Sequence, residues 1–281
     1  ITPDPAYLCA NSSLTLNGNP SGGSGTYTSH AWTGIGSTYL SNSSIVNPVF
    51  SGAPVGIYSL TYTVTDNNTC SATDNISITV YSVPTATISA SDLAECRFSS
   101  SLPVITFSGN NGTPNYSFTY SINGVAQTPV VSTGNTATVN VPTGTPGTYI
   151  YALVSVVDAN NCSQNITGQS VTVTIYDNPT VTVNSPTICA SDGSATITAA
   201  PSPAGTYNYS WTVPGGATNP GNVASFTATV AGTYTVVVTD ANTCTATASG
   251  TLTINANPTA TASASAILCN GGTATLTVTA S

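Results

Sequence analysis

The sequence predicts an all-β protein built from tandem β-sandwich modules, and composition, strand periodicity and internal repetition favour this fold class. Charged residues make up only 4% of the 281 residues, whereas hydrophobic residues make up 40%. Thr, Ser, Val, Ala and Asn fill most of the remainder, which favours strands and turns over helices. A chain of this length has room for two or three domains.

The chain repeats one pattern of elements, and each copy opens with a cysteine. These opening cysteines recur about every 80 to 93 residues, which fits one sandwich per interval, at Cys9, Cys96, Cys189 and Cys269. An aromatic strand follows in each of the first three copies, with Tyr27 and Trp32; Tyr116, Phe118 and Tyr120; and Tyr207, Tyr209 and Trp211. Alternate residues of a strand point to one face, so these rings are expected in the sandwich cores.

A second strand in each of the first three copies begins with Gly-x-Tyr and continues as a run of alternating β-branched residues, which is typical of a half-buried strand. A turn of the form Asp-x-Asn-x-Cys follows, with its aspartate at Asp66, Asp158 and Asp240. We name the cysteines of these turns the closing cysteines: Cys70, Cys162 and Cys244. The aromatic residues predicted to anchor the cores are Trp32, Tyr120, Trp211, Tyr58, Tyr149 and Tyr234.

Proline marks the predicted junctions between modules, because it cannot donate to a strand ladder. Pro84, Pro179 and Pro258 divide the chain into modules 1–83, 84–178 and 179–257, with 258–281 as the first two strands of a fourth. The fourth module would be completed by residues beyond the chain end or by another chain, because two strands alone are marginal. Short linkers restrict rotation, so the modules are expected to form an extended rod.

The charge balance excludes several classes of partner. Arg97 is the single basic residue, and the formal net charge is −8. Binding of nucleic acid or anionic membranes needs several Lys or Arg contacts, so neither is expected. No stretch approaches the roughly 20 apolar residues of a membrane span. The chain begins at Ile1 and contains no Met, so we expect a piece of a mature, processed protein.

The order of opening Cys, aromatic strand, Gly-x-Tyr strand and Asp-x-Asn-x-Cys turn resembles the PKD-like and SprB-type repeats of large surface adhesins of gliding Bacteroidetes. The resemblance covers the whole chain and is closest in the third module, in YSWTVPGG and GTYTVVVTDANTC. It implies immunoglobulin-like sandwiches, type IX secretion and a role in adhesion or gliding motility. The Trp-x-Phe-Gly-Asp-Gly signature of PKD domains proper is absent, since Trp211 is followed by TVPGG.

Seven cysteines without a Cys-x-x-Cys motif indicate disulfides formed in an oxidising compartment rather than a zinc site. Pairing within repeats would join Cys9 to Cys70, Cys96 to Cys162 and Cys189 to Cys244, leaving Cys269 to pair beyond the chain end. Pairing across junctions would join Cys70 to Cys96, Cys162 to Cys189 and Cys244 to Cys269. The resemblance favours the first, because each module of that family type carries both cysteines. A regular sandwich, however, places the opening and closing cysteines of one module at opposite ends.

The sequence contains little that could serve catalysis or metal binding. Calcium at Asp66, Asp158 and Asp240, helped by junction residues such as Asp4, Asp92, Asp177 and Asp192, is an alternative to hydrogen bonding within turns. One carboxylate per turn is too few for the six to eight oxygens that calcium takes, so the turn interpretation is preferred and no cofactor is expected. His30 is the only histidine, on the aromatic strand, where a packing or surface role is expected.

These observations predict a non-enzymatic, extracellular segment of a surface filament or adhesin. Its expected partners are neighbouring modules of a longer chain or identical chains in a fibre, with cell-surface or extracellular glycans as a further partner class. The alternative function is a carbohydrate-binding or spacer array of a secreted hydrolase. A ligand screen separates the two, because a specific saccharide bound in a defined cleft would favour the alternative.

Overall fold

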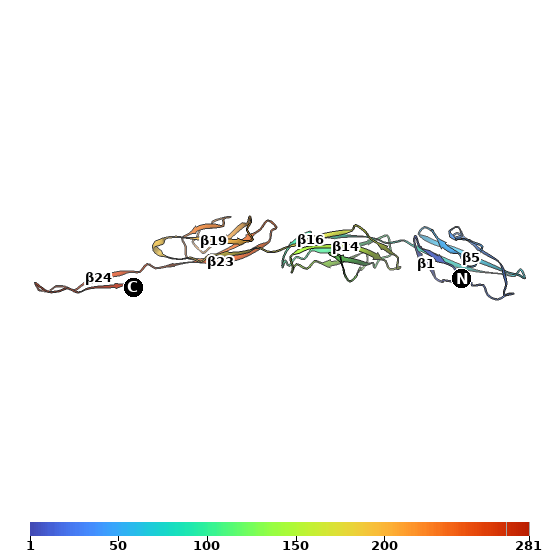
Figure 1. The fold of residues 1–281 in the computed structure, drawn as a ribbon, viewed down its shortest axis with the longest axis horizontal. Coiled ribbons are helices and arrows are strands. Elements are labelled where there is room, and N and C mark those ends of the chain that lie inside the picture. The colour runs from blue at the N-terminus through green and yellow to red at the C-terminus, as the bar shows by residue number, and fades with distance from the viewer. Residues whose placement is uncertain (268, 281) are drawn as a thin grey trace. The chain divides into compact units, whose positions relative to one another are not determined.

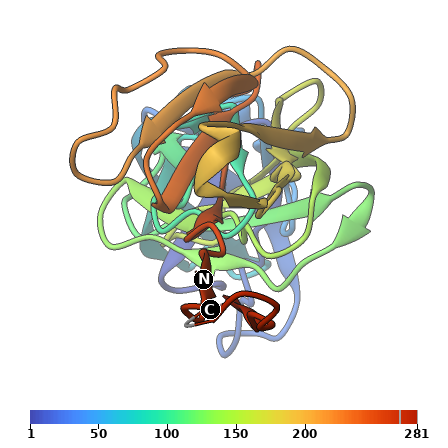
Figure 2. The same cartoon turned by 90° about the vertical axis from the view of Figure 1, so that its left-hand side faces the viewer.

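The computed structural model describes residues 1–267 and 269–280, and the regular secondary structure of this part is almost entirely β-strand (Figure 1). The strands group into two compact units. The first holds Ile1–Glu95, Ser100–Thr143 and Gly147–Ile175, and the second holds Cys96–Ser99, Gly144–Pro146 and residues from Tyr176 onward. Figure 2 shows the strands and their connecting loops from a second direction. None of the helices in the described part is long and apolar enough to cross a membrane.

The first sandwich packs a four-stranded sheet, ordered β1-β6-β5-β3, against the short pair β2-β4. Its core is one cluster that includes Trp32, Phe50, Leu60 and Ile78. The elements are β1 (Ala6–Cys9), β2 (Ser13–Thr15), β3 (Tyr27–Thr33), the 3₁₀ turn η1 (Ser37–Tyr39), β4 (Val49–Ser51), β5 (Gly56–Asp66) and β6 (Ser71–Tyr81).

The second sandwich faces the sheet β13-β9-β7 against the sheet β11-β10-β14-β16-β8, to which β12 and β15 add as side strands. Its core includes Phe107, Phe118, Tyr151 and Val173. The elements are β7 (Thr85–Ala90), β8 (Ala94–Cys96), β9 (Val104–Asn110), β10 (Ser117–Ile122), β11 (Val125–Ala126), β12 (Val130–Val131), β13 (Thr136–Asn140), β14 (Gly147–Val157), β15 (Ser163–Asn165) and β16 (Ser170–Tyr176).

The third sandwich repeats the plan, with sheets β17-β19-β21 and β18-β23-β22-β20. Ile197, Trp211 and Val236 lie in its core. The elements are β17 (Thr180–Val183), β18 (Thr187–Cys189), η2 (Ala190–Asp192), β19 (Ala195–Ser202), β20 (Asn208–Thr212), β21 (Ser225–Ala228), β22 (Gly232–Thr239) and β23 (Thr245–Asn255).

The predicted fourth module contributes one antiparallel hairpin, β24 (Ala260–Ala264) and β25 (Leu276–Ala280). All ten strand residues are exposed. Residues 268 and 281 of the predicted range lie outside the described part of the chain. The all-β class and the tandem sandwiches are confirmed by this architecture, while the module boundaries inferred from proline stay a prediction.

The predicted aromatic anchors lie in the cores, with two differences in depth. Trp32, Tyr120, Trp211 and Tyr234 are buried, with at most 6% of their surface exposed. Tyr58 and Tyr149 are half-buried and pack against the edges of their cores.

Each buried indole is tied to a loop that crosses its sandwich. The Nε1–H of Trp32 donates to the carbonyl of Ile45 at 2.9 Å, and that of Trp211 donates to the carbonyl of Val223 at the same distance. A buried indole N–H needs such a partner, because an unpaired donor loses the hydrogen bonds it makes to water. The same side chain therefore fills the core and fixes the loop above it.

A parallel strand pair recurs in the sandwiches and determines where the opening cysteines lie. β1 runs parallel to β6, with Cys9 in register with Tyr81, and β18 runs parallel to β23, with Cys189 in register with Asn255. In the second sandwich β8 is also the neighbour of the last strand, β16. Each opening cysteine therefore lies beside the end of its sandwich's last strand.

Candidate functional site: the cysteine-bearing ends of the sandwiches

The Asp-x-Asn-x-Cys turn has the same hydrogen bonds in all three sandwiches. Oδ1 of Asp66 accepts the backbone N–H of Asn68 and of Cys70, each at 2.9 Å. The Asp66 N–H in turn donates to the Cys70 carbonyl at 2.9 Å. Asp158 and Asp240 make the corresponding three bonds, with all distances between 2.8 and 3.0 Å. The aspartate thus closes the turn and fixes the backbone of the closing cysteine.

The residue before each closing cysteine has a left-handed backbone. The φ angles are 64° at Thr69, 61° at Asn161 and 69° at Thr243. Residues other than Gly rarely adopt this region, at a cost of about 1 to 3 kcal/mol. The hydrogen bonds to the aspartate offset that cost, so the shape of the turn depends on the carboxylate.

The second carboxylate oxygen ties the turn to a loop across the sandwich. Oδ2 of Asp66 accepts the backbone N–H of Ser24 at 3.0 Å, and Oδ2 of Asp158 accepts that of Thr113 at 2.9 Å. Asp66 is only 5% exposed. The Ser24 backbone N–H, followed by those of Cys70 and Asn68, holds the pKa of Asp66 below its ordinary value of 3.8, although desolvation acts in the opposite direction.

These contacts close the turns. Among the described residues no three His, Cys, Asp or Glu side chains gather closely enough to hold a metal ion. Two of the junction aspartates have protein partners of their own. Asp177 pairs with Arg97 at 3.2 Å, and Asp192 accepts the N–H of Cys189 at 2.9 Å.

His30 and Arg97 have structural contacts. On β3, the Nδ1 atom of His30 lies 2.6 Å from the hydroxyl oxygen of Tyr62, within the aromatic group around Trp32. The guanidinium of Arg97 donates to the Gly144 carbonyl at 3.1 Å as well as to Asp177. The lone histidine and the lone basic side chain thus support local packing and loop structure.

The disulfides join the opening cysteine of one sandwich to the closing cysteine of the next in sequence. Cys9 bonds to Cys162, and Cys96 bonds to Cys244, with a Cα–Cα distance of 5.5 Å in each. Cys70, Cys189 and Cys269 carry no disulfide within the described residues. The pairing expected within repeats is wrong, and so is the alternative across the junctions.

Strand direction gives the physical reason. Cys9 lies beside the last residue of β6, whereas Cys70 directly precedes the first. The 11 residues of β6 rise about 3.3 Å each, so roughly 36 Å separates the two cysteine positions. A disulfide requires Cα atoms within about 7 Å. The opening cysteine lies where the chain leaves a sandwich, and the closing cysteine lies where the chain enters the next one, so these two meet.

The Cys9–Cys162 bond lies beside a small cavity inside the first compact unit. Tyr7 and Tyr81 line one side of this cavity, and residues 159–161 of the Asp158 turn line the other. The two tyrosine rings lie 6.3 Å apart. Cys162 is fully buried there, and Cys244 is 1% exposed in its own disulfide. One sequence signal pointed to this arrangement: the opening and closing cysteines of one repeat lie at opposite ends of a regular sandwich. The resemblance to repeats that carry both cysteines nevertheless favoured pairing within the repeat.

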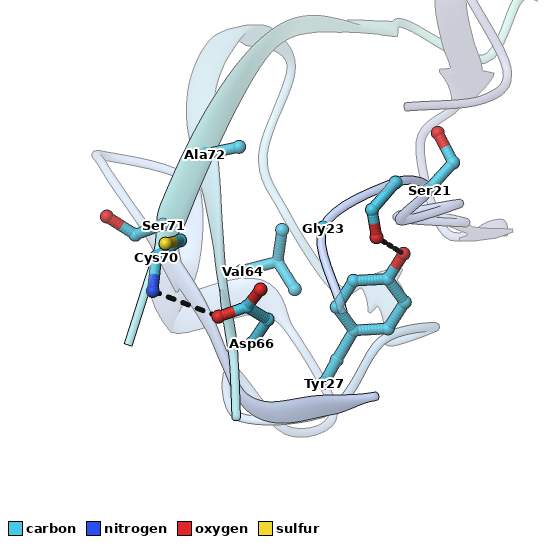
Figure 3. Close-up of a pocket in the computed structure, with 9 residues that line it drawn as sticks. Ser21, Gly23, Tyr27, Val64, Asp66, Cys70, Ser71 and Ala72 are labelled. Atoms are coloured by element: carbon cyan, nitrogen blue, oxygen red, sulfur yellow. Dashed lines mark hydrogen bonds between the residues drawn. The ribbon is translucent and has the colours of Figure 1, made fainter. Parts of the chain in front are cut away.

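The equivalent end of the first sandwich is open. Cys70 is exposed and lies on the rim of a surface pocket with Ser21, Tyr27, Asp66 and Ala72 (Figure 3). The Tyr27 hydroxyl donates to the Gly22 carbonyl at 3.0 Å, which holds the loop on the opposite side of the pocket. This end therefore presents a free thiol in a fixed turn.

Removing the Asp66 charge is expected to change the stability of the first sandwich at acidic pH. Because the folded-state pKa lies below the unfolded-state value, the ionised carboxylate stabilises the fold above about pH 4, and this contribution is lost as pH falls through the folded pKa. Unfolding followed by hydrogen exchange in β5 and β6 from pH 6 to pH 2 should show a smaller acid loss in Asp66→Asn than in the unchanged chain. Equal acid loss in both proteins would contradict this role.

Comparison with known proteins gives one family match and several similar solved structures. Residues 8–80 match a family model described as K319L-like, PKD domain. No curated protein matches the chain. Similar solved structures include an I-band fragment of titin, with 12% identity and a TM-score of 0.47, covering 89% of this chain and 95% of its own.

Two further structures resemble the chain. A PKD domain from the KIAA 1837 protein has 23% identity and a TM-score of 0.25, covering 27% of this chain and 79% of its own. A structure concerned with host cell surface retention of a 1.5-MDa bacterial ice-binding adhesin has 18% identity and a TM-score of 0.40. The match covers 90% of this chain and 95% of that chain. A PKD-like match is thus found for the first sandwich, and the SprB-type relation stays a prediction.

Proposed function

We propose that this chain is a structural or adhesive segment of an extracellular repeat protein, in which covalently linked β-sandwiches act as spacers and contact surfaces. The observation that carries the proposal is the pair of disulfides, Cys9–Cys162 and Cys96–Cys244, each joining elements of successive sandwiches. Neither bond lies within a single sandwich. It limits how far successive sandwiches can separate, which is the property that a load-bearing spacer needs.

The disulfides also support an extracellular location, because structural disulfides persist in oxidising compartments and are rare in the cytosol. Composition points the same way. A surface with one basic residue offers trypsin-like proteases a single cleavage site, at Arg97. The element order shared with SprB-type repeats extends the proposal to surface adhesins of gliding bacteria and to type IX secretion.

Surface labelling tests the proposal. Antibodies raised against the 281-residue chain should label intact cells of the source organism, and labelling should not increase after the cells are permeabilised. Labelling that requires permeabilisation would contradict an extracellular segment. A parallel screen of the full chain against a panel of glycans addresses the alternative function. Saturable binding of one saccharide, abolished by a substitution in one cleft, would favour a carbohydrate-binding array.

A further inference from the structure

We propose that the end of the first sandwich that carries Cys70 is a covalent docking site for another β-sandwich with an opening cysteine. The free opening cysteine of the third sandwich, Cys189, has the required position, so a second copy of this chain can supply the partner. The inference rests on the geometry of the two observed disulfides and does not depend on whether the chain is adhesive.

The turn that holds Cys70, which we call its frame, consists of the Asp66 side chain and the left-handed residue before the cysteine. It matches the turns that hold the two bonded closing cysteines. The backbone N–H of Cys70 lies 2.9 Å from Oδ1 of Asp66, compared with 2.9 Å for Cys162 and 2.8 Å for Cys244 with their own aspartates. The preceding residue is left-handed in all three. Both other copies of this frame hold a disulfide to an opening cysteine, so the same site is seen occupied twice within one molecule.

The sulfur of Cys70 also has the orientation of a bonded one. It lies 3.9 Å from the carbonyl oxygen of Asn68, and the sulfur of disulfide-bonded Cys244 lies 4.0 Å from that of Asn242. The difference is burial, since Cys244 is 1% exposed and Cys70 lies at the surface. Among the described residues, no sandwich end covers Cys70 as one covers each of its counterparts.

Cys189 has the complementary position. It ends β18 beside the last residue of β23, as Cys9 ends β1 beside the last residue of β6. Its backbone is fixed by Asp192, which accepts the Cys189 N–H at 2.9 Å. Its thiol is exposed and carries no disulfide. The two thiols thus repeat the closing and opening roles of Cys162 and Cys9.

The contact surface follows from the occupied junction. There, Tyr7 and Tyr81 face the turn residues 159–161. The corresponding turn residues of the first sandwich, 67–69, are exposed. A docked sandwich end would cover these residues together with the pocket beside Cys70 (Figure 3).

Bond formation needs an oxidant, for which a small disulfide such as oxidised glutathione suffices. The Cys70 thiolate attacks one glutathione sulfur, and the first glutathione leaves as a thiolate. The Cys189 thiolate of the second chain then attacks the Cys70 sulfur of the mixed disulfide, and the second glutathione leaves. Two protein thiols become one disulfide, and one oxidised glutathione becomes two reduced molecules.

The test uses the full chain in a Cys269→Ser background, so that Cys70 and Cys189 are the remaining free thiols. The protein, at a concentration of about 1 mM, is equilibrated in a glutathione redox buffer. This protein concentration matches the effective concentration of a module tethered by a short linker. After alkylation, mass spectrometry identifies the linked peptides in dimers and larger species. Random pairing would give Cys70–Cys189 in about half of the linked peptides, whereas we expect a tenfold or greater excess of Cys70–Cys189 over both symmetric pairs combined.

A matched variant separates the site from simple exposure. Asn68→Cys with Cys70→Ser moves the thiol two residues along the same exposed turn, and its cross-linking to Cys189 should fall at least tenfold. Random pairing in the parent, equal cross-linking of the displaced thiol, or Cys70 recovered only as monomer with glutathione attached would each overturn the proposal. A Cys70–Cys189 bond confined to monomers would do the same.

Discussion

Stretched by its two ends, the oxidised chain should reach less than half the length that the reduced chain reaches. The two disulfides let force pass from the N-terminus to Cys9, across to Cys162, back along the chain to Cys96, and across to Cys244. This path leaves roughly 110 residues of chain between the ends, or about 400 Å at ~3.6 Å per residue. The reduced chain of 281 residues should reach about 1000 Å.

Single-molecule force spectroscopy measures these lengths directly, with and without a reducing agent. Replacing both Cys9 and Cys96 by Ser should give the oxidised chain its full reduced length. The matched control is Cys70→Ser, which removes a cysteine without a bond and should leave the length unchanged. A greater extended length of the oxidised Cys70→Ser chain would show that Cys70 forms a disulfide that bears force, as pairing within the repeat would require. Full extension of the unmodified oxidised chain would also contradict the observed pairing.

Truncating Trp211 to Ala should destabilise the third sandwich by about 3 to 5 kcal/mol, as for other large aromatic side chains removed from cores. The indole is 4% exposed and meets the ring of Phe226 edge-on, with centroids 5.0 Å apart. Its loss leaves a cavity and also deprives the Val223 carbonyl of its donor. Hydrogen exchange measured on β22 should therefore speed up by about 100-fold or more, because each 1.4 kcal/mol is a factor of ten.

The other sandwiches provide internal controls for this measurement. The slowest amides of β5 in the first sandwich should exchange at the same rate in the variant, because they belong to a separate core. Trp211→Phe keeps most of the apolar volume and loses the N–H donor, so its effect should fall between those of the unchanged chain and of Trp211→Ala. Unchanged exchange in β22 of Trp211→Ala would mean that the indole does not anchor the core.

The sequence by itself determined the strands and the faces they bury, because these depend on local periodicity. The i, i+2, i+4 spacing of Tyr116, Phe118 and Tyr120 placed all three rings in one core, where at most 6% of each is exposed. The repeated Asp-x-Asn-x-Cys segment likewise predicted a turn closed by its own aspartate, since all atoms of that turn lie within a few residues. Such features follow from short-range geometry that a sequence displays directly.

Only the tertiary structure decided which cysteines meet, because pairing depends on the direction of strands that are far apart in sequence. The parallel alignment of β1 with β6 carries Cys9 to the end of the sandwich opposite Cys70, and brings it instead to Cys162. Residue spacing could not reveal this, since the more uniform separations, those across the junctions, do not correspond to the bonds that form. The half-buried position of Tyr58 was decided in the same way, by its contacts with the rings of Tyr39 and Phe50. Long-range contacts thus set the covalent links between sandwiches, while local pattern set the sandwiches themselves.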